Sequence, residues 1–563
     1  MIAACAVVAL LFTPSLARAQ QSATAILKQV VIVSDLAAIQ PEGVAPSNTP
    51  IDVRGPDFLQ NPVFAAILTT HLGRTLTHDE LTSLVKTIFD YCRLNGHSLV
   101  DVVVPEQAID NGVMQIAVVQ LKGGKVTISG NRWFSEQAIA HYIHVENGKV
   151  VDEQSMADSI AALNRSPYRH ATIVYNRAGP DTTDVEVKVV DRMPFTAYAG
   201  FGTTGTQSLG SNQIFAGFDW GNVFGLDHDL SVQYLSSTDL LTGYPASPDL
   251  PNQPTLQAIQ GSYTLPTFGN QRMSISGAYE EGVPTVDPNF SQTISDLQLS
   301  TRYVFPLPVR PNLSQEISTG VDYDRSDGQL KFTGILVSTT TTEVLQGALE
   351  YALKYDSPHK AGEVYSTTNL NLGLYLSPGG LTPDNTTEQF NLARQGAKAD
   401  YAYLHARADH LAPLFGPVSW YVGGQAQVAT GALLSNQKLW LGGFDTIRGY
   451  DENSASGDSG VLMRNELRID LLNGGRGLIP AASSGFLGEQ FVQLYGFWDI
   501  GWVKDLEQEF ATPESVTLQS AGIGFRYQFL TNLSVQGDFG WQLRALPGQE
   551  KGQRGDVLAV ISY

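Results

Sequence analysis

The sequence predicts two small α+β modules followed by an all-β transmembrane barrel, with 16 antiparallel strands as the favoured number. Helix and strand patterns are mixed up to residue 191, whereas strand alternation alone continues from there to residue 563. Only 16% of the residues are charged, and the chain contains 54 Gly, 24 Phe and 22 Tyr residues. Such a composition without long apolar runs is typical of a barrel that crosses a membrane with strands. Composition alone leaves a large soluble β protein as the alternative.

The first 19 residues have the features of a secretory signal peptide. An apolar core runs over 2–12, and Ala17-Arg18-Ala19 provides a small-residue cleavage site. The core is too short to span a bilayer as a helix, and it lacks the Lys or Arg that normally precedes it. Because Cys5 lies in this leader, we expect a mature chain with a single thiol, Cys92, and no internal disulfide.

The first α+β module is expected over 20–121. Thr77 and Glu80 form a capping box at the start of a helix. Apolar residues then recur at i, i+3, i+4, i+7, i+8 and i+11 from Leu81 to Cys92, which predicts one buried helix face with Cys92 in the core. The other expected elements are a helix over 59–71, strands over 99–104 and 113–120, and an exposed Pro/Gly-rich loop over 41–56.

A second, smaller module is expected over 122–191. A strand is predicted around Val126, followed by two short helices that Ser135 and Asp152 cap. A hairpin over 171–191 completes the module. Both modules therefore have the order β-α-α-β-β.

The segment 192–563 alternates apolar and polar residues in strand after strand. Leu370, Leu372 and Leu374, for example, alternate with Asn and Gly residues. A β-sandwich would also bury one face and solvate the other, but long strands with aromatic residues at their ends favour apolar side chains toward lipid and polar ones toward a lumen. At about 10 residues per strand and about as many per connection, the segment accommodates roughly 16–19 strands, and bacterial barrels use even numbers.

One arginine interrupts the glycine-rich, loop-like stretch 439–460. Arg448 is either a solvated loop charge or is held by a partner elsewhere in the chain. Strand parity supplies a candidate partner: Asp499 shares one strand face with Phe497 and Gly501, and this face points to the lumen in the barrel interpretation. A carboxylate there requires a partner wherever water is excluded.

Four segments resemble one family, the two-partner-secretion transporters of the haemolysin-activator and filamentous-haemagglutinin-secretion type. VPEQAIDNGVMQIAVVQ, with Pro105 and Gln107, is similar to the end of the first polypeptide-transport-associated (POTRA) domain of that family, and 163–194 is similar to the end of the second. IRGY at 447–450 is similar to the (V/I)RG(Y/F) tetrad of the sixth extracellular loop, and FWDIGW at 497–502 to the F-x-D-x-G strand motif. The resemblance covers nearly the whole mature chain in family order. It departs at the N-terminus, where the family often has a plug helix; here the first strand is expected at about Ile26.

The resemblance implies an anchored loop inside the barrel. In this family the loop that corresponds to 439–460 folds back into the lumen, which would bring Arg448 to Asp499. A planar guanidinium can pair with a carboxylate through two hydrogen bonds, and Gly449 allows a tight turn at the tip. The other residues that match the two motifs are Ile447, Tyr450, Phe497 and Gly501.

The resemblance also implies the domains, the location and the function. The implied domains are POTRA 1 over 20–121, including the Pro-rich insert, POTRA 2 over 122–191, and the barrel over 192–563. The implied function is an outer-membrane pore, with its POTRA domains in the periplasm, that exports one large, unfolded partner protein without ATP. This partner, an adhesin, haemolysin or similar protein, would be extended and β-helical. Further implied partners are outer-membrane lipid and, during biogenesis, the barrel-assembly machinery and periplasmic chaperones.

Capture of the partner is expected at the POTRA domains, by strand addition to an exposed sheet edge. The candidates are Pro105 and Gln107 in the first module, and Val126, Ile128, Gln137 and Tyr142 in the second. A net charge of −20 argues against a nucleic-acid partner. The ten His residues show no metal-ligand spacing, so the sequence gives no reason to expect a metal or a cofactor.

Three other functions fit parts of the sequence. A barrel-assembly factor of the same superfamily would insert other barrels, but two modules rather than more, together with the Pro-x-Gln motif, favour secretion. A passive solute porin lacks periplasmic modules, so 26–191 counts against it. An outer-membrane enzyme lacks a convincing site: GDSG at 457–460 resembles a serine-protease nucleophile, yet Val461 follows it and no matching His or Asp context is evident. We therefore expect a protein that is not an enzyme.

Overall fold

The computed structural model describes 25–109, 111–243, 253–284, 289–357, 366–473, 477–478, 490–507, 513–530 and 532–563. The expected signal peptide, 1–19, lies outside these residues. The chain divides into two compact units. The first contains the residues up to Ser129, Ile143–Ala157 and Thr172–Lys188; the second contains Gly130–Tyr142, Asp158–Ala171 and Val189–Tyr563. None of the helices within the described ranges is both long and apolar enough to cross a membrane.

The first unit contains a four-stranded sheet in the order β2-β1-β4-β3. β1 pairs in parallel with β2 and β4, and β3 is antiparallel to β4. The elements are β1 (Gln29–Val33), η1 (Leu36–Ala38), β2 (Ile51–Arg54), η2 (Asp57–Leu59), α1 (Pro62–Thr69), α2 (His78–Leu94), β3 (Val100–Val103) and β4 (Val113–Gln120).

Helix α2 forms as its sequence pattern predicts. The Thr77 hydroxyl accepts a hydrogen bond from the Glu80 N–H at 3.2 Å, which caps the helix N-terminus. Leu84, Ile88 and Cys92 are fully buried and belong to the same apolar core as side chains of β1 and β4. Burial raises the pKa of the Cys92 thiol to about 12, so this cysteine is an unreactive core residue.

The prediction that 41–56 is only an exposed loop is wrong at the end of this segment. Ile51–Arg54 forms β2, an edge strand whose two apolar side chains pack on the core. Pro50 precedes the strand and Pro56 follows it closely. Because proline cannot donate a ladder hydrogen bond, these residues confine the strand to a short stretch at the sheet edge. In the sequence, the apolar–polar alternation of 51–54 was not recognised as a strand because it is short and prolines lie on both sides of it.

A second sheet has three strands in the order β5-β7-β6. β5 pairs in parallel with β7 and lies at one edge. Ser135 accepts the Ala138 N–H and Asp152 accepts the Gln154 N–H, so each caps a helix as the sequence predicts. The elements are β5 (Lys122–Ser129), α3 (Glu136–Ala140), α4 (Glu153–Leu163), β6 (Arg169–Arg177) and β7 (Thr182–Asp191).

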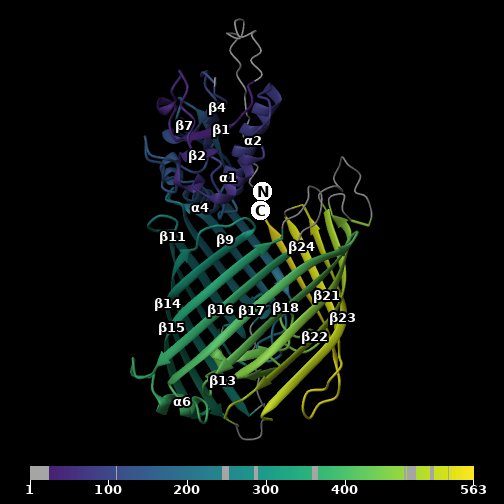
Figure 1. The fold of residues 1–563 in the computed structure, drawn as a ribbon. Coiled ribbons are helices and arrows are strands. Elements are labelled where there is room, and N and C mark those ends of the chain that lie inside the picture. Colours follow the sequence, from purple (N-terminus) through teal and green to yellow (C-terminus); the bar gives the residue numbers. More distant parts are fainter. Residues whose placement is uncertain are drawn as a thin grey trace. The chain divides into compact units, whose positions relative to one another are not determined.

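Most of the second unit is a closed barrel of 16 antiparallel strands, the predicted number. β8 closes the ring by pairing with both β9 and β25, and the strands cross the barrel obliquely (Figure 1), as closure requires. The strands are β8 (Phe195–Gly202), β9 (Gln213–Val223), β10 (His228–Ser237), β11 (Leu256–Pro266), β12 (Arg272–Gly282), β13 (Phe290–Pro306), β14 (Leu313–Phe332), β15 (Ile335–Asp356), β16 (Thr367–Pro378), β17 (Asp400–Phe415), β18 (Val418–Ala429), β21 (Ser459–Asn473), β22 (Gln490–Lys504), β23 (Ser515–Phe529), β24 (Leu533–Gln542) and β25 (Gln553–Ser562). The connections contain α5 (Asp239–Thr242), α6 (Thr387–Ala393), η3 (Ser435–Gln437), β19 (Leu439–Leu441) and β20 (Ala455–Gly457).

The two faces of the barrel strands differ as the alternation predicts. On β22, Leu494, Trp498 and Trp502 are exposed on the outer face, whereas Tyr495 and Asp499 are buried on the inner face. Apolar side chains on the outside suit lipid, and polar side chains on the inside line the lumen.

The two ends of the barrel have different connections. At one end several strand pairs are joined by short turns, such as 224–227 between β9 and β10. Asp227 in this turn accepts two hydrogen bonds from the Arg169 guanidinium, and one from the Tyr142 hydroxyl at 2.6 Å, within the same compact unit. At the other end, 430–458 connects β18 to β21 and is the longest connection in the barrel.

Candidate functional site

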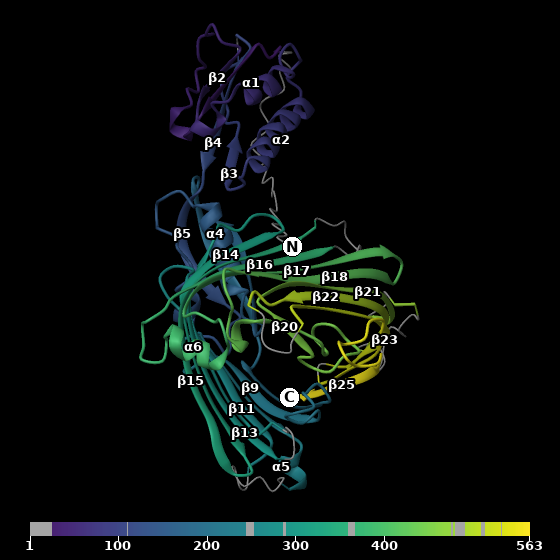
Figure 2. The ribbon, with the colours of Figure 1, turned by 90° about the horizontal axis from the view of Figure 1, so that it is seen from below.

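The connection 430–458 folds into the barrel instead of away from it. Figure 2 shows β20 inside the ring of strands. β19 and β20 form a short antiparallel hairpin, and apolar side chains of this connection pack with Leu462, Val503 and Leu518 of the wall. The connection is the sixth at this end of the barrel and contains the stretch 439–460 almost entirely, so we call it loop 6.

Arg448 lies at the tip of loop 6 and is 1% exposed. Its guanidinium pairs with Asp499 of β22 through two hydrogen bonds, from Nε to Oδ2 at 2.8 Å and from Nη2 to Oδ1 at 2.9 Å. The backbone N–H of Arg448 donates to the same carboxylate at 3.3 Å. Asp499 is 0% exposed. The structure therefore brings together the two residues that the sequence suggested as partners, and it shields the pair from solvent.

Two further carboxylates surround Arg448. Its Nη1 donates to Oε1 of Glu466 on β21 at 2.6 Å, and lies 3.5 Å from Oδ1 of Asp538 on β24. Glu466 also accepts hydrogen bonds from Arg468 at 2.8 Å and from Arg526 at 3.0 Å. Sequence reasoning did not name these partners. In the sequence, Glu466 and Asp538 lie on the strand faces opposite the apolar residues, but this alternation does not reveal the strand register that brings the two carboxylates to one point.

Aromatic rings flank these ion pairs. The Arg448 guanidinium carbon lies 3.8 Å from the centre of the Phe497 ring, and that of Arg526 lies 4.1 Å from the centre of the Tyr495 ring. Both distances are in the range of cation–π contacts. The Tyr495 hydroxyl also donates to Asp538 at 2.6 Å. By excluding water, the rings strengthen the attraction between the charges that they cover.

At two positions, loop 6 and the barrel wall lie too close together to leave room for a side chain. Gly449 has a φ of +86°, and a Cβ on it would lie 2.9 Å from the carbonyl carbon of Gly540 on β24. Only glycine adopts this conformation readily and allows this approach. On the wall, a Cβ on Gly501 would lie 2.9 Å from Leu441 and 3.2 Å from Ile447 of loop 6. Both motif glycines therefore permit close packing of the loop.

The remaining motif residues are also packed against the barrel. Ile447 and Tyr450 are both 0% exposed, and Ile447 packs in the apolar cluster between loop 6 and the wall. The Tyr450 hydroxyl lies 2.8 Å from the carbonyl oxygen of Gln519 and 2.6 Å from that of Arg544. All four residues of IRGY thus contact the barrel.

In the first module, Gln107 has a contact with the sheet. Its Nε2 donates to the carbonyl oxygen of Gln115 on β4 at 2.7 Å, and its Oε1 accepts the Gln115 N–H at 2.8 Å. Pro105 is joined to Gln107 by a hydrogen bond from the Gln107 amide to the Pro105 carbonyl at 3.3 Å. The side chain of Gln107 therefore pairs with the backbone as a neighbouring strand would.

The other capture candidates lie in different settings. Val126 and Ile128 belong to β5, the edge strand of the second sheet. Gln137 is exposed on α3. Tyr142 is 6% exposed and is bonded to Asp227. Its burial suits docking against the short barrel turn and leaves little surface for a partner to contact.

A second ion cluster lies at the base of loop 6. Asp458, in the GDSG stretch, is 0% exposed and accepts hydrogen bonds from Arg394 Nη2 at 3.0 Å and from the backbone N–H groups of Leu433 and Leu506. Arg394 also donates to Asp505 at 3.0 Å. Asp458 therefore joins three connections at this end of the barrel. Over the described ranges, no group of three or more His, Cys, Asp or Glu residues could hold a metal ion.

Two family models match the chain. The model described as "Haemolysin secretion/activation protein ShlB/FhaC/HecB" matches 181–527, which is more than half of the chain. The model of the ShlB-type POTRA domain matches 48–120.

Characterised proteins and solved structures are similar over most of the chain. The heme/hemopexin transporter protein HuxB of Haemophilus influenzae is 21% identical over 480 residues, which cover 82% of this chain and 77% of HuxB. The outer membrane transporter CdiB of Dickeya dadantii is 21% identical over 418 residues, which cover 71% of this chain and 68% of CdiB. The structure of CdiB from Escherichia coli is similar with a TM-score of 0.74 and 15% identity, covering 98% of this chain and 93% of that one. CdiB from Acinetobacter baumannii is similar with a TM-score of 0.64 and 15% identity, covering 96% and 90%.

Proposed function

The chain belongs to the haemolysin secretion/activation protein family ShlB/FhaC/HecB, and from this premise we propose that loop 6, held by Arg448, keeps its pore competent for export. As a member of this family, the chain is a two-partner-secretion transporter of the outer membrane that exports a partner protein. Members of the family are transporters rather than enzymes.

The observation that carries the proposal is the burial of Arg448 among carboxylates of the barrel wall. Arg448 bonds to β21 and β22 while loop 6 occupies part of the lumen. Removing one partner of a shielded ion pair costs about 3–5 kcal/mol, because the other charge is left buried without compensation. The inward position of loop 6 therefore depends on a few side chains, and Arg448 and Asp499 are its principal anchor.

We propose that the domains follow the expected boundaries. POTRA 1 extends over 20–121 and POTRA 2 over 122–191, both in the periplasm, and the barrel extends over 192–563. The partner would pass through this barrel as an extended, unfolded chain and fold outside into a β-helix. Folding outside supplies direction, so no ATP is required. During its own biogenesis, the chain would interact with the barrel-assembly machinery, periplasmic chaperones and outer-membrane lipid.

Capture of the partner is assigned to the edge of β5, where Val126 and Ile128 lie. An edge strand offers N–H and C=O groups that pair with an added strand whatever its side chains. This tolerance suits an extended partner of varied sequence. Gln137, exposed on α3, is a further candidate contact, whereas Gln107 supports the sheet through Gln115.

The test compares export by the source bacterium after deletion of the gene and after its replacement by variants. Deletion should remove one large protein from the culture medium, as quantified by mass spectrometry, and the wild-type gene should restore it. Arg448→Ala should restore about a tenth or less, since 1.4 kcal/mol already corresponds to tenfold. The amount of folded barrel, judged by heat-modifiable migration in gels, should stay unchanged.

The matched control is Arg407→Ala, which removes an exposed arginine from β17 and should export normally. Wild-type export by Arg448→Ala would contradict the role of the anchor. An unchanged medium after deletion of the gene would contradict export itself.

A further inference from the structure

The inner wall of the barrel has an uncharged stretch that spans four neighbouring strands. Ser231 of β10 is the direct partner of Ser262 on β11, which pairs with Ser276 on β12, which pairs with Ser300 on β13. Four serines therefore form one row across the wall. These serines lie on the inner face, because side chains alternate along each strand and their chain neighbours, such as Ile275 and Leu299, are exposed apolar side chains of the outer face.

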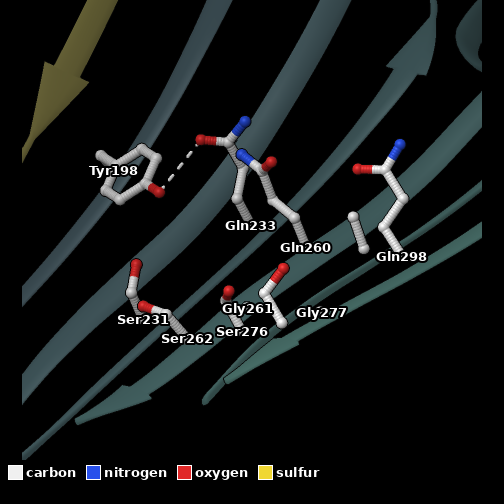
Figure 3. Close-up of a pocket in the computed structure, with 11 residues that line it drawn as sticks. Tyr198, Ser231, Gln233, Gln260, Gly261, Ser262, Ser276, Gly277 and Gln298 are labelled. Carbon is white, nitrogen blue, oxygen red and sulfur yellow. Dashed lines mark hydrogen bonds between the residues drawn. The ribbon is translucent and has the colours of Figure 1, made fainter. Parts of the chain in front are cut away.

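A second row lies two residues further along the same strands. Gln233 pairs with Gln260, Gln260 with Ala278, and Ala278 with Gln298. Figure 3 shows the three glutamines beside the serines, with Tyr198 donating a hydrogen bond to Gln233 at 3.1 Å. Together these residues line a hollow of about 330 Å³ that is open to the lumen. We call the two rows the Ser/Gln strip.

Charged residues border the Ser/Gln strip on both sides. On β14, Asp322 is the partner of Ser300 and Asp324 is the partner of Gln298. On β9, Asp219 is the partner of Ser231. Elsewhere on the wall, the cluster around Arg448 is occupied by its own ion pairs. The strip is thus a bounded region whose chemistry differs from that of the surrounding lumen.

We propose that the Ser/Gln strip is the surface along which an extended segment of the partner protein moves through the pore; this inference rests on the proposed export function. Serine hydroxyls and glutamine amides both donate and accept hydrogen bonds, so they can bond to the backbone N–H and C=O groups of any sequence. Water offers the same bonds, so each contact has a small net strength. Passage through a pore requires contacts that form easily and are also released easily.

Charged walls would serve such passage less well. A buried or paired charge discriminates strongly between opposite and like charges on a passing chain. An uncharged strip has no such preference, so acidic and basic segments of a partner can follow one another. Gln260 and Gln298, which are exposed, are the side chains best placed for the contact.

Cysteine cross-linking to a defined probe tests this proposal. Cys92 is fully buried and its thiol pKa is raised to about 12, so introduced cysteines can be labelled selectively. Ser262→Cys and Gln298→Cys place thiols on two strands of the strip. Asn371→Cys places one on an exposed inner position of β16, next to Arg407 and outside the strip. The probe is a synthetic, unstructured, uncharged peptide rich in Gly, Ser and Asn with one activated disulfide, added to the full-length protein in lipid vesicles.

For each introduced cysteine, the rate of mixed-disulfide formation with the peptide is divided by the rate of reaction with a small neutral thiol reagent. This ratio corrects for differences in the accessibility of the thiols. The two strip cysteines should react with the peptide about tenfold faster than Asn371→Cys, the factor that one or two extra hydrogen bonds supply. Equal rates at the three sites, or the fastest rate at Asn371→Cys, would overturn the strip while leaving export intact. Absence of reaction at every inner cysteine would overturn the strip, and the gene-deletion experiment above would then decide separately whether export itself fails.

Discussion

Two buried Arg–Asp pairs in the barrel unit differ in their surroundings. Arg448 and Asp499 join loop 6 to β22, and Arg169 and Asp227 join the start of β6 to the short turn after β9. Both guanidinium groups form two hydrogen bonds with their carboxylate. Arg448 has further carboxylates on β21 and β24, whereas Arg169 bonds additionally to a neutral group, the Leu163 carbonyl at 2.7 Å.

Arg448 therefore belongs to a network of ion pairs, whereas the pair of Arg169 and Asp227 is an isolated contact. Loss of Arg448 leaves carboxylates of three strands without their shared cation, and these strands lie around the lumen. Loss of Arg169 leaves one carboxylate in one turn. The same side-chain pairing can therefore hold a loop across a pore or fasten two neighbouring segments, depending on how many strands supply partners.

The largest expected effect comes from removing each arginine in turn. Arg448→Ala should destabilise the docked loop by about 3–5 kcal/mol and nearly abolish export, because Asp499 and Glu466 stay shielded without it. Arg169→Ala should have a smaller effect on export, since only Asp227 then lacks its cation and the Tyr142 hydroxyl still donates a hydrogen bond to it. The readouts are the amount of partner protein exported and the rates of proteolysis of loop 6 and of the turn 224–227. Equal export losses would contradict the distinction between network and isolated contact; Arg407→Ala, at an exposed arginine of β17, is the control.

The next largest effect is expected from neutralising a shared carboxylate. Glu466→Gln keeps the shape of the side chain but removes the charge that Arg448, Arg468 and Arg526 share. We expect a loss of about 1–3 kcal/mol in barrel stability, the usual range for weakening buried polar contacts. This loss of stability is measured by heat-modifiable migration in gels after heating at a series of temperatures.

Glu316→Gln is the matched control for this prediction. Glu316 pairs with Arg272 and its side chain is 24% exposed, so its neutralisation should cost less. A larger loss in Glu316→Gln than in Glu466→Gln would argue that the network is no more important than an ordinary pair in the lumen.

A smaller effect is expected at the tip of loop 6. Gly449→Ala introduces a side chain at positive φ, which costs about 1–2 kcal/mol, and it also meets the backbone of Gly540. Gly548→Ala has a similar φ of +77° but no atom within 4 Å of the new Cβ. The excess destabilisation of Gly449→Ala over Gly548→Ala, measured by thermal migration, reports the close approach of loop and wall. An excess of zero would show that the tip is not packed against β24.

The smallest effect is a dependence on pH. Burial, followed by repulsion from Asp445 and Asp556, raises the pKa of Glu452 in loop 6 to about 7. Because the folded state holds this proton more tightly than the unfolded state, docking of the loop is favoured below about pH 4.5 and weakens as the pH rises through 7. Proteolysis of loop 6 should therefore be faster at pH 8 than at pH 5. Glu452→Gln should flatten this dependence, and an unchanged profile in that variant would contradict the assignment.

Much of the barrel could be predicted because a single rule, the period of two, governs every strand. That rule predicted the inner position of Asp499, and the length of the alternating segment, with the even strand numbers of bacterial barrels, predicted the number of strands. It could not predict that Glu466 and Asp538 meet at Arg448, because register depends on pairing along the whole barrel. The inward position of loop 6 followed from family resemblance, since no periodicity marks a loop that folds back. The strand β2 was missed because prolines lie on both sides of its short alternation. The burial of Tyr142 was missed because it depends on a contact with Asp227, which is distant in the sequence.

The most direct test of the central claim is a double-mutant cycle at Arg448 and Asp499, read out as the amount of partner protein exported per folded barrel. If the pair anchors loop 6, then Arg448→Ala, Asp499→Ala and the double variant should all show a similar, roughly tenfold or greater loss, because the second substitution removes an interaction that is already broken. Wild-type export by either single variant, or a loss in the double variant equal to the product of the two single losses, would contradict the claim.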